Sequence, residues 1–155
     1  MNKKKIIHTD LPYHCYFLTA NTKYRKEWLK DFDLAHEVLD AIYQYREEYE
    51  FKLLAFVIMP DHFHLMLVPT GERSASEIMK EIKRTSSIKI NRRSGRKGAF
   101  WQEGYYEDIL DGEKMVKGKI EYIHNNPVKA GLSMTQADYL FSSANERWKK
   151  DWDYL

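Results

Sequence analysis

The chain has 155 residues, of which 43% are hydrophobic, and its 25 basic and 23 acidic side chains almost balance. This length and apolar content are typical of one compact domain. The longest apolar run, residues 53–60, is much shorter than the roughly 20 residues of a membrane-spanning helix, and no signal-like apolar stretch follows the basic N-terminus. We therefore expect one cytoplasmic domain over residues 1–155, without a membrane span.

Two elements are expected in the first third of the chain. Residues 13–20 (YHCYFLTA) are rich in aromatic and branched side chains, which favours a strand. From about residue 33 to residue 49, apolar side chains recur with the period of a helix, at Ala35, Val38, Leu39, Ile42 and Tyr43. Asp31 or Asp33 is a suitable N-cap for this amphipathic helix.

The middle of the chain predicts a β-hairpin. Residues 51–59 (FKLLAFVIM) form an almost continuous apolar run, as expected for a strand that is covered on both faces. Pro60 and Asp61 are typical turn residues. Residues 62–68 (HFHLMLV) then resume as the second strand of the hairpin.

A second helix is expected to end near residue 91, because apolar side chains recur at Ile78, Met79 and Ile82. Residues 80–97 contain eight basic residues against one acidic residue, whereas residues 31–50 contain seven acidic residues against one basic residue. A run of like charges is either a solvated helix face or a surface for a polyanion such as nucleic acid. Both interpretations remain open on charge alone.

The remaining elements complete a known arrangement. Residues 100–110 contain a last strand, and a third helix is expected from about residue 113 to residue 126, where Pro127 should stop it. The order strand, helix, strand, strand, helix, strand, helix predicts an α+β fold. We expect a ferredoxin-like sandwich with a four-stranded antiparallel sheet and an additional C-terminal helix, a core of about residues 11–132, and a C-terminal extension over residues 133–155.

Two histidines in the second hairpin strand are candidate metal ligands. Side chains alternate along a strand, so His62 and His64 share one face, while Phe63, Leu65 and Leu67 lie on the other. Two neutral imidazoles on one stiff strand are well placed to hold a divalent cation if another ligand joins them. The alternative is a pair of ordinary hydrogen-bonded polar residues.

The third helix carries two further candidates. Tyr122 and Asn126 are four residues apart and therefore lie on one helix face. A tyrosine hydroxyl beside a metal-polarised phosphate can attack it and form a covalent bond, and an asparagine oxygen suits Mg²⁺ or Mn²⁺. Alternatively, Tyr122 only packs and Asn126 only marks a helix end. His124 points away from Tyr122 and is expected at the surface.

Several motifs, in order along the chain, resemble a known family. His62-Phe63-His64 matches the histidine, hydrophobic, histidine signature of HUH single-strand nucleases. The phrases MPDHFHLML and FWQEGYY, and above all YIHNNPVKAGL followed by FSSAN, resemble the single-tyrosine transposases of insertion sequences, especially the REP-associated tyrosine transposases. The resemblance extends from about residue 51 to residue 145. Near the N-terminus, LTANTKYRKEWL is not diagnostic, and no DNA contact is assigned to it.

The resemblance implies an enzyme that cuts and rejoins single-stranded, hairpin-bearing DNA. Tyr122 would be the nucleophile that forms a 5′-phosphotyrosine bond. His62, His64 and Asn126 would hold Mg²⁺ or Mn²⁺. In relatives, the tyrosine helix completes the site of its own chain or of a partner, so a homodimer stays an open alternative.

The resemblance also implies that the basic cluster binds DNA. We expect its side chains to neutralise DNA phosphates; they are Lys83, Arg84, Lys89, Arg92, Arg93, Arg96 and Lys97. Nearby aromatic residues could stack on unpaired bases, although for Phe100 and Trp101 a place in the core is favoured. Two other classes of function compete with the transposase. They are a non-catalytic module that binds single-stranded nucleic acid, and a metal-dependent hydrolase that uses activated water and gives Tyr122 no role.

Overall fold

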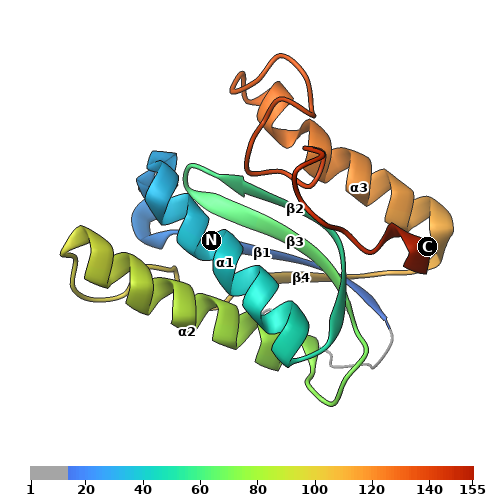
Figure 1. Ribbon diagram of the computed structural model, residues 1–155, viewed down its shortest axis with the longest axis horizontal. Helices are drawn as coiled ribbons and strands as arrows, with labels where there is room; N and C mark the ends of the chain where they lie inside the picture. The colour runs from blue at the N-terminus through green and yellow to red at the C-terminus, as the bar shows by residue number, and fades with distance from the viewer. Residues whose placement is uncertain (1–13) are drawn as a thin grey trace, which may run out of the picture.

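The structure, a computed structural model, describes residues 14–155. It has one four-stranded antiparallel sheet with strand order β2-β3-β1-β4 (Figure 1). The strands are β1 (Cys15–Asn21), β2 (Phe51–Met59), β3 (His62–Pro69) and β4 (Tyr106–Leu110), and the helices are α1 (Phe32–Glu48), α2 (Ala75–Ser94) and α3 (Gly112–Lys129). The predicted α+β sandwich is confirmed. The expected strand start at Tyr13 and core start near residue 11 lie outside the described residues.

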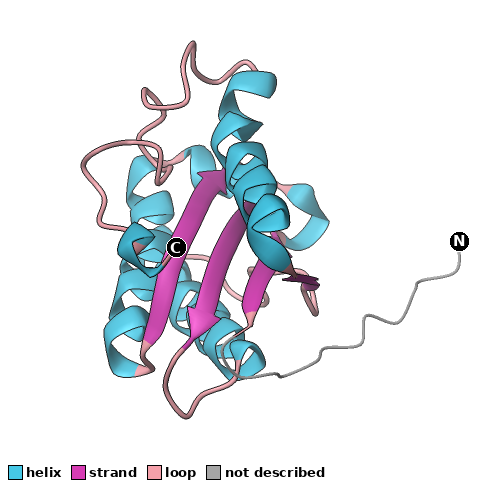
Figure 2. Cartoon of the chain, turned by 90° about the vertical axis from the view of Figure 1, so that its right-hand side faces the viewer, coloured by secondary structure: helices cyan, strands magenta, loops and turns pink. Residues whose placement is uncertain are grey.

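The two faces of the sheet carry two separate apolar cores, because side chains alternate along each strand. One face packs against α1 and α2 through a large cluster that includes Tyr16, Leu18, Phe63, Leu65 and Leu67. The other packs against α3 through a smaller cluster that includes Phe17, Met66, Val116 and Ile123 (Figure 2). The prediction that Phe63, Leu65 and Leu67 face away from the histidines is therefore confirmed.

Side-chain caps explain where α1 and α2 begin. The Asp31 carboxylate accepts hydrogen bonds from the backbone N–H groups of Asp33 and Leu34, so Asp31 is the N-cap of α1. Ser74 caps α2 in a capping box, in which Ser74 and Glu77 each accept a hydrogen bond from the other's backbone N–H. For α1, the contact decides between Asp31 and Asp33, which the sequence leaves open.

The predicted end of the third helix at Asn126 is wrong, because α3 continues through Pro127 to Lys129. A proline in the last turn removes only one backbone donor, and the helix ends instead at the left-handed Gly131, whose φ is +74°. The N–H of Gly131 bonds to the carbonyl of Val128, and the N–H of Leu132 bonds to the carbonyl of Pro127. This pair of bonds is a Schellman motif, which stops a helix efficiently.

The C-terminal extension packs against β2, which is an edge strand of the sheet. Ser142 bridges Val57, the N–H of Ile58 bonds to Phe141, and the N–H of Ser143 bonds to Phe56. The backbone edge of β2 is thereby partly satisfied, which limits pairing with other chains. Among residues 14–155, no helix is long and apolar enough to cross a membrane.

Candidate active site

His62 and His64 lie on the face of β3 that α3 covers, with their ring centroids 4.8 Å apart. His64 is opposite Thr19 of β1 and stacks on Phe17 at 5.1 Å between ring centroids. His62 is the first residue after the hairpin turn and is less buried than His64. The pair therefore lies at the end of the sheet next to the hairpin turn.

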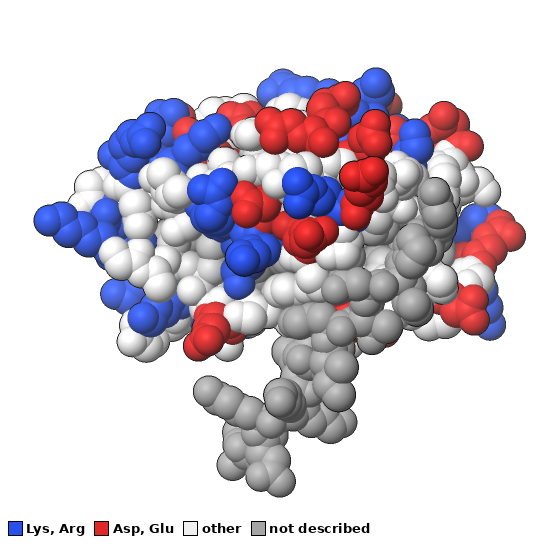
Figure 3. All heavy atoms as spheres, turned by 90° about the horizontal axis from the view of Figure 1, so that it is seen from below, with Lys and Arg blue, Asp and Glu red and all other residues white. Residues whose placement is uncertain are grey.

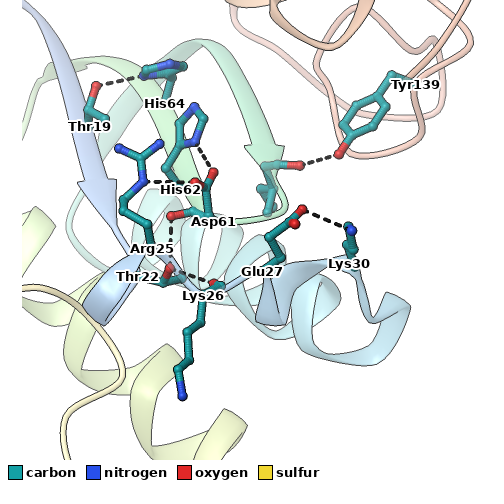
Figure 4. Close-up of polar contacts among 11 residues, drawn as sticks. Thr19, Thr22, Arg25, Lys26, Glu27, Lys30, Asp61, His62, His64 and Tyr139 are labelled. Atoms are coloured by element: carbon teal, nitrogen blue, oxygen red, sulfur yellow. Dashed lines mark hydrogen bonds and ion pairs between the residues drawn. The ribbon is translucent and has the colours of Figure 1, made fainter. Parts of the chain in front are cut away.

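Hydrogen bonds fix how both imidazoles are presented (Figure 4). Asp61 Oδ1 lies 2.7 Å from His62 Nδ1, and Thr19 Oγ1 lies 2.7 Å from His64 Nδ1. A carboxylate accepts a hydrogen bond from His62 Nδ1–H, so in the neutral ring Nε2 carries the lone pair. Because both contacts use Nδ1, the two Nε2 atoms remain for a cation, as in many metal sites.

The surroundings of His64 keep its imidazole neutral. Burial lowers its pKa to about 3, and the positive charges of Lys119 and Arg25 act in the same direction. Only 6% of His64 is exposed. A metal ligand must be an unprotonated imidazole, so His64 is ready to bind a cation near neutral pH.

Tyr122 of α3 lies beside this pair. Its ring centroid is 5.6 Å from that of His64 and 6.1 Å from that of Phe17, and 47% of the residue is exposed. Lys119, one turn earlier, places its ammonium 5.2 Å from the Tyr122 ring centroid. The structure thus brings the tyrosine, one histidine and a cationic side chain together within a single chain.

Asn126 lies one helical turn beyond Tyr122 and has an unusual amide. Its Oδ1 atom is buried and has no hydrogen-bond partner among the described residues. A buried polar atom without a partner is costly, so this oxygen is suited to accept a contact from a ligand. Across residues 14–155, no three His, Cys, Asp or Glu side chains form a group able to hold a metal ion, so a third ligand would have to be of another type. An asparagine oxygen is such a ligand.

His124 is not at the surface, contrary to the expectation from its helix position. It is 6% exposed, and its Nε2 lies 2.7 Å from Ser143 Oγ of the C-terminal extension. Burial, helped by the charge of Lys150, lowers the pKa of His124 to about 4. The sequence did not indicate that the extension would cover this side of α3.

The predicted DNA-binding cluster lies on α2 and the loop after it, whereas the histidine face is covered by α3. Several members have contacts within the protein. Lys83 donates to the carbonyls of Gln102 and Gly104, and burial lowers its pKa. Arg84 pairs with Glu81, and Arg93 pairs with Glu37 of the acidic helix α1. The two oppositely charged helices are thus neighbours and partly neutralise each other.

The most exposed part of the cluster is at the end of α2. Arg92 and Lys97 are exposed, Lys89 is half-buried, and Arg96 lies over the rings of Trp28 and Phe100. Figure 3 shows basic side chains gathered at one end of the molecule. Gln102, in the loop that follows α2, bonds through its N–H to Asn21, which pairs with His62. The loop after α2 therefore reaches the end of the sheet that carries the histidines.

Sequence reasoning missed three residues around the site. Asp61 and Thr19 hold the histidines, and Lys119 lies over Tyr122. Asp61 directly precedes His62, so the sequence could have indicated a carboxylate beside this candidate ligand. Lys119 was readable from its spacing of three residues before Tyr122. Nothing in the sequence pairs Thr19 with His64, because that contact depends on strand register.

Comparisons with known proteins place the chain among its relatives. The family model described as "Transposase IS200 like" matches residues 8–126. A Haemophilus influenzae protein assigned as a REP-associated tyrosine transposase is 28% identical over 153 residues, covering 88% of this chain and 86% of its own. The REP-associated tyrosine transposase of Escherichia coli is 28% identical over 130 residues, with coverage of 83% and 74%.

A solved structure of a REP-associated tyrosine transposase bound to a REP hairpin has a TM-score of 0.76 to this chain. It covers 90% of this chain and 82% of its own, at 23% identity. At this level of identity, the likeness supports the fold alone.

Proposed function

Because the chain belongs to the family of IS200-like transposases, we propose that it cleaves and rejoins single-stranded, hairpin-bearing DNA through a 5′-phosphotyrosine intermediate on Tyr122. The observation that carries this proposal is the 5.6 Å separation between the ring centroids of Tyr122 and His64. A hairpin is proposed as the substrate because the similar solved structure is described as bound to a REP hairpin.

The proposed reaction is an exchange of one phosphoester for another. The Tyr122 oxygen attacks the scissile phosphorus, a bond from this oxygen to phosphorus forms, and the bond from phosphorus to the 3′ oxygen breaks. The tyrosine loses its proton and the departing 3′ oxygen gains one, so a free 3′-hydroxyl results. In the reverse direction a 3′-hydroxyl attacks the phosphotyrosine, and the strand is resealed without an external energy source.

His62 Nε2, His64 Nε2 and Asn126 Oδ1 are the proposed ligands of Mg²⁺ or Mn²⁺. The fit rests on two observations: both histidines are hydrogen-bonded through Nδ1, and the Asn126 oxygen is buried without a partner among the described residues. When bound, the ion would polarise the scissile phosphate and stabilise negative charge that develops on it. The histidines contribute neutral, pre-oriented nitrogen ligands, and Tyr122 contributes the attacking oxygen.

The nearness of Tyr122 to His64 within one chain supports a site that is completed by its own tyrosine helix. A homodimer is then not required to assemble the site. Cleavage that is first order in protein, with no lag at low protein concentration, is the expected behaviour. Cleavage that rises with the square of the protein concentration would favour a shared site instead.

The test of the function is a search for the covalent adduct. The protein is incubated with a panel of labelled single-stranded hairpin oligonucleotides and Mn²⁺, then separated by denaturing electrophoresis. We expect a shifted, labelled protein band that is absent for Tyr122→Phe, whose ring packing is unchanged. Cutting without an adduct would indicate a hydrolase, and binding without cutting would indicate a non-catalytic module. An adduct formed by Tyr122→Phe would remove Tyr122 from the mechanism.

A further inference from the structure

We propose that Arg25 binds a phosphate of the DNA strand beside the histidine pair, through the terminal nitrogens of its guanidinium group. This inference rests on the function proposed above and adds a substrate contact to the same site. It concerns the loop after β1, a segment whose sequence gave no indication of a DNA contact.

The turn that carries Arg25 is tied to the tip of the β2-β3 hairpin (Figure 4). The backbone N–H of Thr22 bonds to the carbonyl of Asp61 at 2.9 Å. The Thr22 hydroxyl lies 3.1 Å from the same carbonyl and 2.7 Å from that of Lys26. The N–H of Arg25 returns to the carbonyl of Thr22 at 3.0 Å. These contacts hold the turn in one position relative to the histidines.

The backbone of this turn is strained. Tyr24 and Arg25 have φ values of +61° and +54°, in the left-handed region that non-glycine residues seldom adopt. The Tyr24 side chain is 80% exposed, so its burial does not compensate for the strain. Strained residues of this kind persist where the surrounding structure over-determines them, and they cluster at functional sites. The consequence here is a fixed direction for the Arg25 side chain.

Among the residues that the structure describes, the Arg25 guanidinium is held at one nitrogen. Its Nε donates to Asp61 Oδ2 at 2.9 Å, while the other carboxylate oxygen of Asp61 contacts His62. Burial opposes ionisation of Asp61, but its hydrogen bonds with His62 and Arg25 keep its pKa below the usual value. The Asp61 carboxylate thus joins the arginine to the ligand histidine.

The other end of the guanidinium is available for a ligand. Among residues 14–155, no hydrogen bond or ion pair engages the two terminal nitrogens of Arg25, whose side chain is 53% exposed. A guanidinium with two free, parallel donors matches two oxygens of one phosphate. Beside a proposed ion site, a DNA phosphate is the expected occupant.

The experiment measures binding with cleavage disabled, so that it does not depend on the chemistry. In a Tyr122→Phe background, fluorescence anisotropy gives the Kd for the single-stranded hairpin oligonucleotide that this cleavage-disabled protein binds most tightly in a panel. We expect Arg25→Ala to weaken binding roughly tenfold and to reduce the salt dependence by about one phosphate contact. Lys30→Ala is the matched control, because Lys30 is an exposed cation nearby that pairs with Glu27. Its Kd should change less than about twofold.

Neutral methylphosphonates placed one at a time along the oligonucleotide locate the contact. One position should weaken binding to the parent protein but have little further effect on Arg25→Ala, because the two changes remove the same interaction. Arg25→Gln retains a donor for Asp61 and should bind as weakly as Arg25→Ala; it serves as the second variant if alanine disturbs folding. Equal loss at every methylphosphonate position in both proteins, or a Kd for Arg25→Gln equal to that of the control, would overturn the proposal. Absence of a covalent adduct in wild type would instead overturn the proposed function.

Discussion

His64 is the residue on which the proposed ion site depends most directly, because its buried, neutral ring has a single free nitrogen. We expect His64→Ala to abolish cation-dependent formation of the covalent adduct. The ring cannot be replaced by a neighbour, since His62 already occupies the adjacent position on the same strand face. The measurement is adduct yield across a Mn²⁺ titration, with wild type in excess chelator as the reference. Full activity of the wild type in chelator would contradict the role of the ion.

Ionisation of His124 should make the folded state sensitive to acid. Its pKa is about 4 in the folded chain, below the usual value of about 6.5, so the unfolded chain binds more protons between these values. Stability conferred by the neutral ring is therefore fully present above about pH 6.5 and is lost as the pH falls toward 4. The loss should approach about 1.4 kcal/mol for each pH unit in this window.

The matched variant for this effect is His124→Gln, which keeps a polar partner for Ser143 but does not titrate. Urea unfolding at several pH values gives the free energy of unfolding of both proteins. As the pH is lowered, the free energy of unfolding of the wild type should fall more than that of the variant. Parallel curves between pH 7 and pH 4 would show that His124 is not the group responsible.

At the scale of single residues, strand alternation was enough to predict that both histidines share a face and that Phe63, Leu65 and Leu67 oppose them. The hydrogen-bonding partners of those histidines were harder to predict. Asp61 is adjacent in sequence, but Thr19 reaches His64 only because β1 and β3 pair in one register. Arg25 was not predictable, because its direction depends on left-handed backbone dihedrals that no sequence pattern marks.

Among the elements, one glycine inside α3 and one just beyond its end should respond in opposite ways to alanine. Gly131 adopts φ of +74° in the Schellman motif, so Gly131→Ala should lower the free energy of unfolding by about 1 kcal/mol. Gly118 lies inside the helix, and the position that an alanine β-carbon would take there is open space. Gly118→Ala should therefore raise the free energy of unfolding by about 0.5–1 kcal/mol. Chemical denaturation of the two variants checks both signs. A stabilising Gly131→Ala would contradict the assigned helix end.

The contrast between Pro127 and Gly131 explains why the helix end was mispredicted. Proline restricts the residue before it, which is a statistical preference, whereas a left-handed glycine with two capping bonds stops the helix directly. The starts of α1 and α2 were easier to predict, because their N-caps are short polar residues that precede apolar runs. The fourth strand was only partly predicted. Trp101 forms an isolated bridge to Thr22, and the strand begins after the left-handed Gly104.

At the scale of the whole molecule, the clusters of like charge along the chain predicted the charge of the surface only in part. Acidic α1 packs beside basic α2, and pairs such as Arg93 with Glu37 neutralise part of the predicted cluster. What remains exposed lies toward the end of α2, from which the following loop leads back to the end of β1. The hydrophobic pattern predicted the sandwich well, because each helix buries one apolar stripe against the sheet. The contacts between the oppositely charged helices could not be predicted in the same way, because they depend on which helices are neighbours in three dimensions.

A buried ion pair between Arg46 and Asp151 helps to hold the C-terminal extension to the rest of the molecule, and its loss should destabilise the whole fold. Asp151 accepts two hydrogen bonds from Arg46 of α1, at 2.6 and 2.9 Å, and a third from the backbone N–H of Leu53 in β2. The side chains of Arg46 and Asp151 are only 11% and 8% exposed. Removing Asp151 leaves the buried Arg46 charge with only the exposed Glu47 as a partner among the described residues, so Asp151→Ala should cost about 3 kcal/mol.

Glu47→Ala is the control for Asp151→Ala, because Glu47 pairs with the same arginine but its side chain is 75% exposed. Its cost should stay below about 1 kcal/mol. Equilibrium urea unfolding measures both values, and analytical ultracentrifugation reports whether the uncovered edge of β2 then pairs with a second chain. If both substitutions cost the same small amount, the extension is not anchored through Asp151. Because Ser143 of this extension contacts both β2 and His124, its release should also loosen the helix that carries Tyr122.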